Sequence, residues 1–373
     1  MSKNRLHGLD AWRGVAALMV AIYHFNVNSF MHELTIVKNS WLFVEFFFVL
    51  SGFIMMYNYS DRINNREQLL SFLFKRFSRI WPLHIFVLFL FVPVPVAIAG
   101  YVIGNIDPSR FSVASFISNV FLIQSLGVND GVTWNSPSWS ISSEFFVYVA
   151  FGLITLTFTK GWCRFIIPSL ICFVILTNFS NMGDAYKLAF FRCGYSFFIG
   201  CVVYYLYKSK SLKSGTWLEI LSVVAVVLTM SLFLIKGNDL IAYCMPFLFC
   251  AIVFSFARGD GVISKAMGNN LFVKMGEVSY SIYMTHAFVA ICIKSLLLLF
   301  GKFINHNFLV KIGNETQVNL GGVLANNLLD IVFLVLVISF SMLTYRYVES
   351  PCQRILNAWY KNKKMVETSN LVM

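Results

Sequence analysis

Three ionisable side chains lie on one stripe of the first apolar segment of the chain. This segment, LDAWRGVAALMVAIYHF, contains Asp10, Arg13 and His24. On a helix with 100° per residue, Arg13 and His24 lie about 20° apart around the axis, and Asp10 lies within about 60° of both. Such groups are costly at membrane depth, so the stripe is predicted to face a protein interior and to serve a function. A structural polar seam between helices is an equally good interpretation for a lone histidine.

His24 is the side chain of this stripe that could act as a general base. A carboxylate on one ring nitrogen would set the tautomer on the other. His24 lies about 16 Å along the helix axis from Arg13, so Asp10 is too distant to orient it. Glu45 in VEFFFVLSGF and Glu144 in PSWSISSEFFVY are the two acids that could reach its depth from other helices. Alternatively, Glu144 is a first-turn acid that answers its helix dipole, and Glu45 extends outward to solvent.

A second basic cluster lies in FLFKRFSRIWP, which contains Lys75, Arg76 and Arg79. Arg76 and Arg79 are three residues apart, so they point to one face of a helix. Two guanidinium groups placed in this way suit a phosphate. On composition alone, a basic membrane anchor on the cytoplasmic side, with Trp81 at the interface, is the more ordinary interpretation.

Three further polar groups lie within apolar runs. His286 in SYSIYMTHAF could line a cavity or make a hydrogen bond between helices, and Arg192 in FFRCGYSFFIG needs a partner. Ser51 in LSGF could also line a cavity, but it is not in the sequence context of a nucleophilic serine. The eight cysteines include no C-x-x-C pair, and H-E-x-x-H is absent from the sequence, so we expect no metal site.

The composition of the 373-residue chain is that of a membrane protein with several spans. Hydrophobic residues make up 58% and charged residues only 12%, and the mean hydropathy is +0.72. Runs such as Ile80 to Ile106 and Leu240 to Ala257 contain no Asp, Glu, Lys or Arg, and each is near the roughly 20 residues that cross a bilayer. The net charge of +12 is typical of cytoplasmic loops that meet lipid headgroups, so we expect no nucleic-acid partner.

Ten apolar segments are expected to be membrane-spanning helices. They are residues 9–30, 40–58, 80–103, 142–159, 165–180, 187–207, 217–235, 240–257, 278–300 and 324–345. With the N-terminus inside, the inside segments hold 21 of the 29 lysines and arginines, which agrees with the positive-inside rule. The sequence therefore predicts an all-α polytopic membrane protein with about ten transmembrane helices, a retained first span and both termini in the cytoplasm.

Two segments depart from this regular pattern. The third predicted span contains VPVPV, whose Pro93 and Pro95 must interrupt a helix. Residues 111–126 have one apolar face and are too short for a full crossing, so we expect a re-entrant or interfacial helix outside. The membrane domain is expected to comprise residues 1–350. A polar cytoplasmic tail at residues 351–373, loose from Tyr360, should follow it.

Six stretches of the chain together resemble the acyltransferase 3 family of bacterial membrane acyltransferases. They are LDAWRGVAALMVAIYHF, FFFVLSGFIMMYNY, KRFSRIWPLH, PSWSISSEFFVY, SYSIYMTHAF and YRYVESP, in the order that the family has them. The resemblance implies a ten-helix, multi-pass domain in the bacterial inner membrane that transfers acyl groups, commonly acetyl, from acyl-CoA to saccharides. The matching site residues are His24, Glu144, Asp10 and Arg13 as catalytic residues and Arg76 and Arg79, next to Lys75, at the CoA phosphates. Acetyl-CoA is then a donor substrate, and the implied partners are the lipid bilayer and a saccharide or glycolipid acceptor.

These observations lead to one mechanistic hypothesis and one alternative. Acetyl-CoA would dock from the cytoplasm on Arg76 and Arg79 and bring its thioester to His24. His24, held by Glu144 or Glu45, would take the proton of a sugar hydroxyl that arrives from outside, either for direct transfer or by way of an acyl-enzyme. The alternative is a proton-coupled exporter of a glycolipid or polysaccharide, which should show paired hydropathy halves that we do not find.

Overall fold

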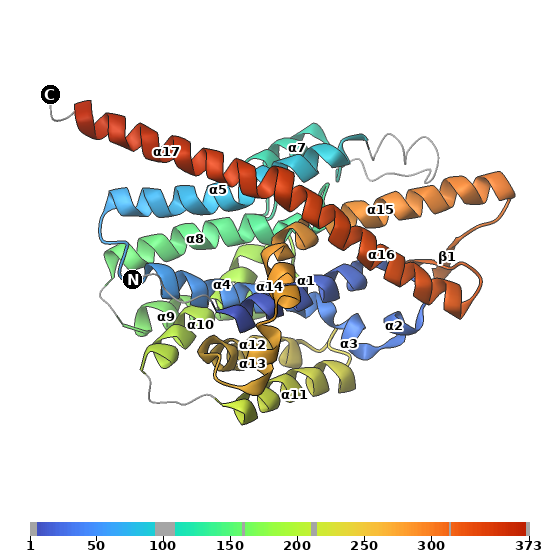
Figure 1. The fold of residues 1–373 in the computed structure, drawn as a ribbon, viewed down its shortest axis with the longest axis horizontal. Helices are drawn as coiled ribbons and strands as arrows, with labels where there is room; N and C mark the ends of the chain where they lie inside the picture. Colours follow the sequence, from blue (N-terminus) through green and yellow to red (C-terminus); the bar gives the residue numbers. More distant parts are fainter. Residues whose placement is uncertain (1–5, 94–108, 159–160, 210–214, 313–314, 371–373) are drawn as a thin grey trace.

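The computed structural model describes residues 6–93, 109–158, 161–209, 215–312 and 315–370, and within these ranges the protein is almost entirely helical (Figure 1). A helix lies at each of the ten predicted spans. These helices are α1 His7–Phe25, α4 Phe43–Tyr59, α5 Arg66–Phe91, α8 Trp139–Thr157, α9 Cys163–Phe179, α10 Ala189–Lys208, α11 Thr216–Leu232, α12 Asp239–Arg258, α15 Ser279–Ile304 and α16 Val323–Thr344. The prediction of an all-α fold is confirmed for the described residues apart from one short β hairpin.

Length and composition support membrane crossing most clearly for six helical segments among the described residues. They are Ser40–Tyr59, Ser136–Thr157, Ala189–Lys208, Asp239–Arg258, Ser279–Ile304 and Val323–Lys364. The helices α9 and α11 are apolar but shorter, with 17 residues each. The count of ten crossings and the cytoplasmic position of both termini stay predictions.

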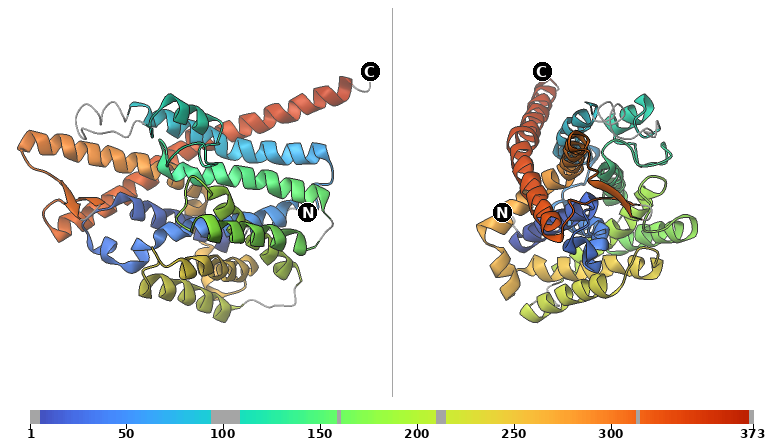
Figure 2. Two further views of the ribbon diagram at one scale, coloured as in Figure 1. Left: turned by 180° about the vertical axis from the view of Figure 1, so that it is seen from behind. Right: turned by 90° about the vertical axis from the view of Figure 1, so that its right-hand side faces the viewer.

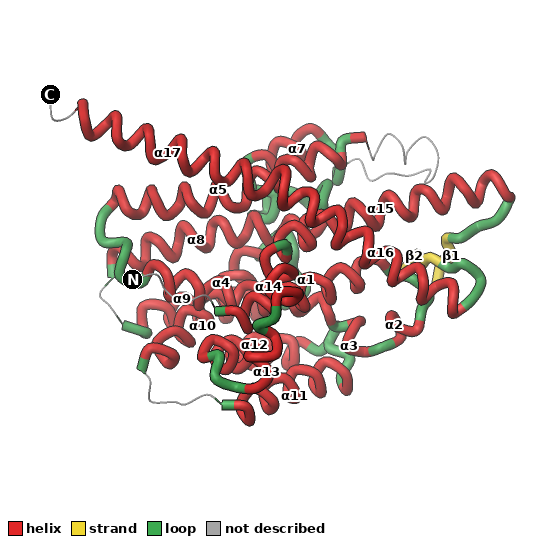
Figure 3. The backbone as a smooth tube through the Cα atoms, in the orientation of Figure 1, coloured by secondary structure: helices red, strands yellow, loops and turns green. Residues whose placement is uncertain are grey.

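Short elements connect the long helices. They are α2 Phe30–Glu33, α3 Thr35–Lys38, η1 Ser40–Leu42, α7 Val113–Val120, η2 Ser136–Ser138, α13 Val262–Met267, α14 Asn270–Glu277, β1 Leu309–Ile312, β2 Glu315–Val318, η3 Tyr345–Glu349 and α17 Ser350–Asn370. The strands β1 and β2 pair in antiparallel register, and Figure 3 shows them as a small hairpin beside a helical bundle. The hairpin lies at the end of the bundle opposite to the end of α17 (Figure 1).

The helix at the third predicted span begins before the span itself. α5 starts at Arg66 rather than at residue 80, because Asn65 caps its first turn by accepting a hydrogen bond from the backbone N–H of Gln68 at 2.9 Å. Lys75, Arg76 and Arg79 therefore lie inside a helix, in agreement with the prediction that Arg76 and Arg79 share one helix face. The expected interruption of the helix is confirmed at Pro93, because α5 ends at Phe91, two residues before it. Pro95 lies outside the described residues.

The segment 111–126 contains only the eight-residue helix α7, which is too short to cross a membrane. Two side chains of α5 hold its C-terminal end. Trp81 donates from Nε1 to the carbonyl oxygen of Val120 at 3.0 Å, and His84 Nε2 lies 2.9 Å from that of Asn119. The segment is therefore docked on α5 as a short helix, in agreement with the prediction that it does not span the membrane.

The C-terminal segment is a helix along its described length, so the expectation of a loose tail from Tyr360 is wrong. The π-helix η3 joins α16 to α17, which continues to Asn370. α17 packs on the first half of α5, where the ring of Tyr360 stacks on that of Phe74 with centroids 4.3 Å apart and Ser78 donates to Asn357 at 3.0 Å. These contacts with α5 give the polar tail a fixed partner.

The helices α1 and α4 form the middle of the bundle, as the end-on view in Figure 2 shows. α4 and α10 approach so closely that their backbones touch at two glycines. A Cβ on Gly52 would overlap the carbonyl oxygen of Phe197, and one on Gly200 would overlap that of Val49. Small residues at helix contacts permit such close packing in membranes, where no hydrophobic effect drives helices together.

Candidate active site

A cavity of about 490 Å³ lies between α1, α4, α5, α8 and α15. Its charged lining residues are Asp10, Arg13, Arg76, Arg79 and Glu144. We call it the arginine cavity, because three guanidinium groups and two carboxylates give it a positive balance that suits an anion. The structure thus brings together residues that the sequence places on three separate helices.

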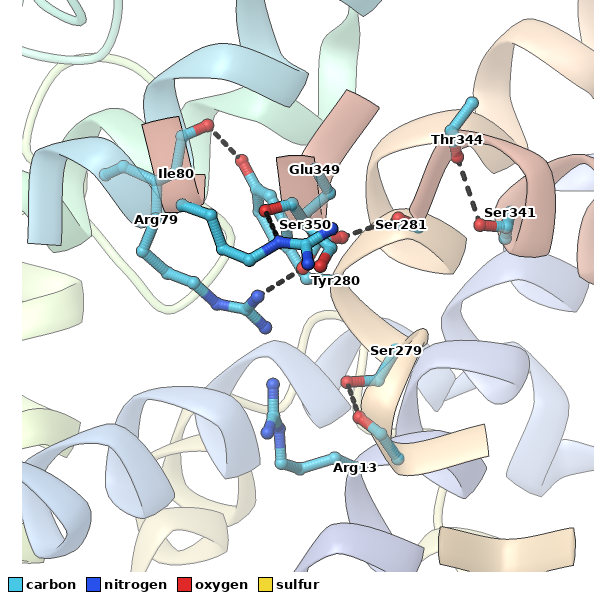
Figure 4. Close-up of polar contacts among 12 residues, drawn as sticks. Arg13, Arg79, Ile80, Ser279, Tyr280, Ser281, Ser341, Thr344, Glu349 and Ser350 are labelled. Carbon is cyan, nitrogen blue, oxygen red and sulfur yellow. Dashed lines mark hydrogen bonds and ion pairs between the residues drawn. The ribbon is translucent and has the colours of Figure 1, made fainter. Parts of the chain in front are cut away.

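Arg79 and Arg13 reach toward each other from opposite walls of the arginine cavity (Figure 4). Arg79 is held by an ion pair with Glu349 of η3, a carboxylate that is 1% exposed. Glu349 also accepts a hydrogen bond from Ser281 at 2.6 Å, and the Arg79 guanidinium lies 5.7 Å from the ring centre of Tyr280. Glu349 was missed as a site residue in the sequence, although it stands in the quoted stretch YRYVESP.

Arg76 is less completely bonded than Arg79. Its Nη2 donates to the Tyr59 hydroxyl at 3.2 Å, and its guanidinium lies 5.5 Å from the centre of that ring. Its Nε is buried and has no hydrogen-bond partner among the described residues. A buried donor without an acceptor is unfavourable, so this atom favours a bound anion. The neighbouring Lys75 is exposed and does not line the cavity, so the structure does not bring it into this cluster.

The two acids of the arginine cavity have protein partners. Asp10 lies 3.6 Å from Arg13, one turn along α1. Glu144 accepts a hydrogen bond from the Tyr148 hydroxyl at 2.6 Å, and the Ser51 hydroxyl lies 2.8 Å from that of Tyr148. Because Tyr148 uses its one proton toward Glu144, Ser51 must donate to Tyr148. Ser51 lines the cavity as expected, at the start of a hydroxyl chain that leads to Glu144.

Glu45 and Arg192 form a buried pair with each other. Arg192 Nε donates to Glu45 at 2.6 Å, and Ser196 donates to the other carboxylate oxygen at 2.5 Å. The guanidinium also lies 4.6 Å from the ring centre of Trp139. Arg192 thus has the partner that it was expected to need, neither residue is among those that line the arginine cavity, and Glu45 is not available to His24.

His24 contacts a second histidine. Its Nδ1 lies 2.9 Å from the carbonyl oxygen of Val20 and 3.3 Å from Nε2 of His286. Nδ1 of His286 lies 3.2 Å from the carbonyl oxygen of Ile282. The expected carboxylate partner of His24 is not found among the described residues, because Glu45 and Glu144 bond elsewhere. Helix α15 supplies an imidazole in its place.

The histidine pair lies next to the arginine cavity and does not line it. His286 is fully buried, whereas His24 is only half-buried. The connection between them and the cavity is Tyr283, which lines the cavity and whose ring centre lies 5.8 Å from that of His286. Of the two interpretations of His286, the structure therefore supports the contact between helices rather than a place in the cavity lining, and the pair stands one helical turn of α15 beyond the cavity wall.

A second cavity of about 560 Å³ adjoins the arginine cavity, with which it shares Leu6 and Tyr57 as lining residues. It is lined by the basic side chains His7, Arg258 and Lys265. The two neighbouring cavities thus have basic linings, and both include the residues at the start of α1.

A family model and two curated relatives match the chain. A family model described as "Acyltransferase domain" matches residues 6–346. The chain is 30% identical over 163 residues to "Acyltransferase MdmB" of Streptomyces mycarofaciens, which is 40% of this chain and 39% of that protein. It is also 30% identical over 157 residues to "Protein 2 in picA locus" of Rhizobium radiobacter, 39% of this chain and 79% of that protein. The first match thus spans about two fifths of its relative's length. No solved structure matches the chain.

Proposed function

The chain belongs to the acyltransferase 3 family of membrane acyltransferases, and from this premise we propose that it transfers an acetyl group from acetyl-CoA to a sugar hydroxyl. The acceptor is a cell-surface polysaccharide or its lipid-linked precursor, and the protein resides in the bacterial inner membrane. The observation that carries the proposal is the arginine cavity near the start of α1, with a half-buried histidine near the end of the same helix.

The arginine cavity is the site for the phosphates of the donor. Arg13, Arg76 and Arg79 all line it, and Arg76 has a buried Nε with no acceptor in the described part of the chain. Guanidinium groups bind phosphate oxygens through paired hydrogen bonds. The second cavity, with His7, Arg258 and Lys265, gives the nucleotide end of CoA room beside the first. A donor held in this way extends its pantetheine arm along α1, away from the basic end.

His24 is the general base at the far end of that arm. It takes the proton of the acceptor hydroxyl while the hydroxyl oxygen attacks the thioester carbonyl carbon. The carbon–sulfur bond then breaks, and the departing CoA thiolate receives the proton from the imidazolium. The products are the acetyl ester of the sugar and free CoA, so atoms and protons balance without a further reactant.

Purified protein with labelled acetyl-CoA and candidate lipid-linked glycans tests this function. Wild-type protein should transfer label to the glycan, and His24→Gln should lose about 10²-fold or more of the rate, since a positioned base contributes roughly 10²- to 10⁴-fold. His306→Gln is the matched control, because His306 is exposed and remote from α1 in sequence. Full transfer by His24→Gln would contradict the role of the base.

An experiment with whole cells separates the enzyme from an exporter. Surface polysaccharide from cells with the protein should carry additional mass of one acetyl group, by mass spectrometry, compared with cells that lack it. Transport of glycan coupled to proton flux, without any acylated product, would overturn the proposed function.

A further inference from the structure

The hydrogen bonds of His24 and His286 determine where their protons lie. A carbonyl oxygen only accepts hydrogen bonds, so the nitrogen opposite it must carry the hydrogen. His24 Nδ1 is 2.9 Å from the carbonyl oxygen of Val20, and His286 Nδ1 is 3.2 Å from that of Ile282. Both neutral rings are therefore protonated at Nδ1 and carry a lone pair at Nε2.

These tautomers complement each other. The lone pair on Nε2 of His286 lies 3.3 Å from Nδ1–H of His24, which is thereby shared between the second ring and the carbonyl oxygen of Val20. In the opposite tautomer of His24, the single lone pair on Nδ1 would face both that carbonyl oxygen and the lone pair on Nε2 of His286. The pair of rings thus favours one tautomer of His24 over the other.

Nε2 of His24 is left as the unprotonated nitrogen. It has no hydrogen-bond partner among the described residues, yet it is not one of their buried side-chain atoms that lack a partner. The atom is therefore accessible. A base needs a lone pair that can reach the hydroxyl proton, and Nε2 meets this requirement.

We propose that His286 is a positioning residue that holds His24 in the Nδ1-protonated tautomer and so presents Nε2 as the base; this inference rests on the proposed function. When Nε2 takes a proton, Nδ1–H keeps both acceptors, so the imidazolium is stabilised without a carboxylate. His286 is buried and touches no reacting atom; it acts only through His24.

Other ionisable groups lie near this end of α1. Lys294 of α15 lies 6.0 Å from the ring centre of Phe25, and the rings of Tyr23 and His24 are nearly perpendicular with centroids 5.0 Å apart. His32 and Asp330 pair through Ser29, which donates to Asp330 at 2.5 Å and lies 3.0 Å from His32. A pH profile of the reaction has to be interpreted with these groups in mind, so the test needs a second readout.

Nitrogen-15 NMR of the histidine rings measures the tautomer directly. In full-length wild-type protein, the His24 signal, identified by its loss in His24→Gln, should show protonated Nδ1 and bare Nε2. His286→Leu should shift His24 toward a mixture of tautomers and lower kcat about tenfold or more, with KM for acetyl-CoA unchanged. His286→Gln should keep most of the wild-type tautomer preference and most of kcat, because its amide oxygen can accept a hydrogen bond from His24 Nδ1–H.

His84→Gln is the matched control for the loss of a buried histidine. His84 lies on α5, is fully buried and, like His24, bonds a backbone carbonyl oxygen. Its variant should leave the His24 signal unchanged. A wild-type His24 protonated at Nε2, or a His286→Leu variant with unchanged His24 signal and kcat, would overturn the inference. The NMR measurement needs no substrate, so it tests the tautomer of His24 separately from the reaction. Absence of transfer to any acceptor would contradict the proposed function and leave the tautomer result unaffected.

Discussion

The three arginines of the arginine cavity differ in the partners that already hold them. Arg79 pairs with the buried Glu349, and Arg13 lies 3.6 Å from Asp10. Arg76 has only a neutral partner, the Tyr59 hydroxyl, and a buried Nε without an acceptor. Arg76 is therefore the arginine that gains most when an anion enters, because its charge has no carboxylate partner among the described residues and one of its donors is unsatisfied.

Arg76→Gln should weaken CoA binding more than it lowers the stability of the folded protein. A hydrogen bond to a charged group contributes about 1.5–3 kcal/mol, which corresponds to roughly a 10- to 100-fold rise in Kd. Titration calorimetry of CoA against the purified protein measures this change. Lys75→Gln is the matched control, since Lys75 is the adjacent cation but is exposed and does not line the cavity. If both variants bind CoA as the wild type does, Arg76 is not part of the donor site.

At the scale of helices, the periodicity of the sequence predicts which face a side chain lies on. It does not predict which residue the side chain contacts. The period of α1 correctly places Asp10 and Arg13 on one face, and both line the arginine cavity. The partner of His24 could not be predicted, because His286 lies 262 positions later and its contact depends on how α1 and α15 pack. Local spacing gives the direction of a side chain, and tertiary packing decides what stands opposite it.

The start of α5 shows the same limit. Hydropathy places Lys75, Arg76 and Arg79 before the third predicted span, whereas the structure continues the helix back through them to Arg66. The helix includes these residues because other parts of the chain contact this part of α5. Glu349 of η3 pairs with Arg79, and Tyr360 of α17 covers Phe74. Both partners come from the last 30 residues of the chain, so no local window around α5 contains this information.

The contact between α4 and α10 depends on its two glycines. Gly52→Ala or Gly200→Ala should destabilise the protein, because the added Cβ would overlap a backbone carbonyl oxygen that cannot move alone. Overpacking of this kind costs about 1–3 kcal/mol, seen as a lower melting temperature in detergent. Gly215→Ala is the control, since a Cβ there meets nothing within 4 Å. Equal melting temperatures for all three variants would show that this contact is not tight.

At the scale of the whole molecule, the proposed reaction requires that the bundle has two chemically different ends. The arginine cavity includes Leu6, Tyr57 and Asn58, which lie at the start of α1 and near the end of α4. His24 stands near the other end of α1, where Val27 pairs with Val318 of the hairpin. CoA is a cytoplasmic metabolite and the proposed acceptor is extracytoplasmic, so the basic end must face inward and the hairpin outward.

Labelling of single introduced cysteines tests this orientation. Thr316→Cys places an exposed thiol on the hairpin, and Asn64→Cys places one on the exposed turn before α5. A membrane-impermeant maleimide should label Thr316→Cys in intact cells and Asn64→Cys only after the membrane is opened. The unsubstituted chain is the control, since it has its own exposed Cys163 and Cys244. The reverse pattern would place the arginine cavity on the side without CoA, and the proposed direction of transfer would then be untenable even if the protein proved to be an acyltransferase in detergent.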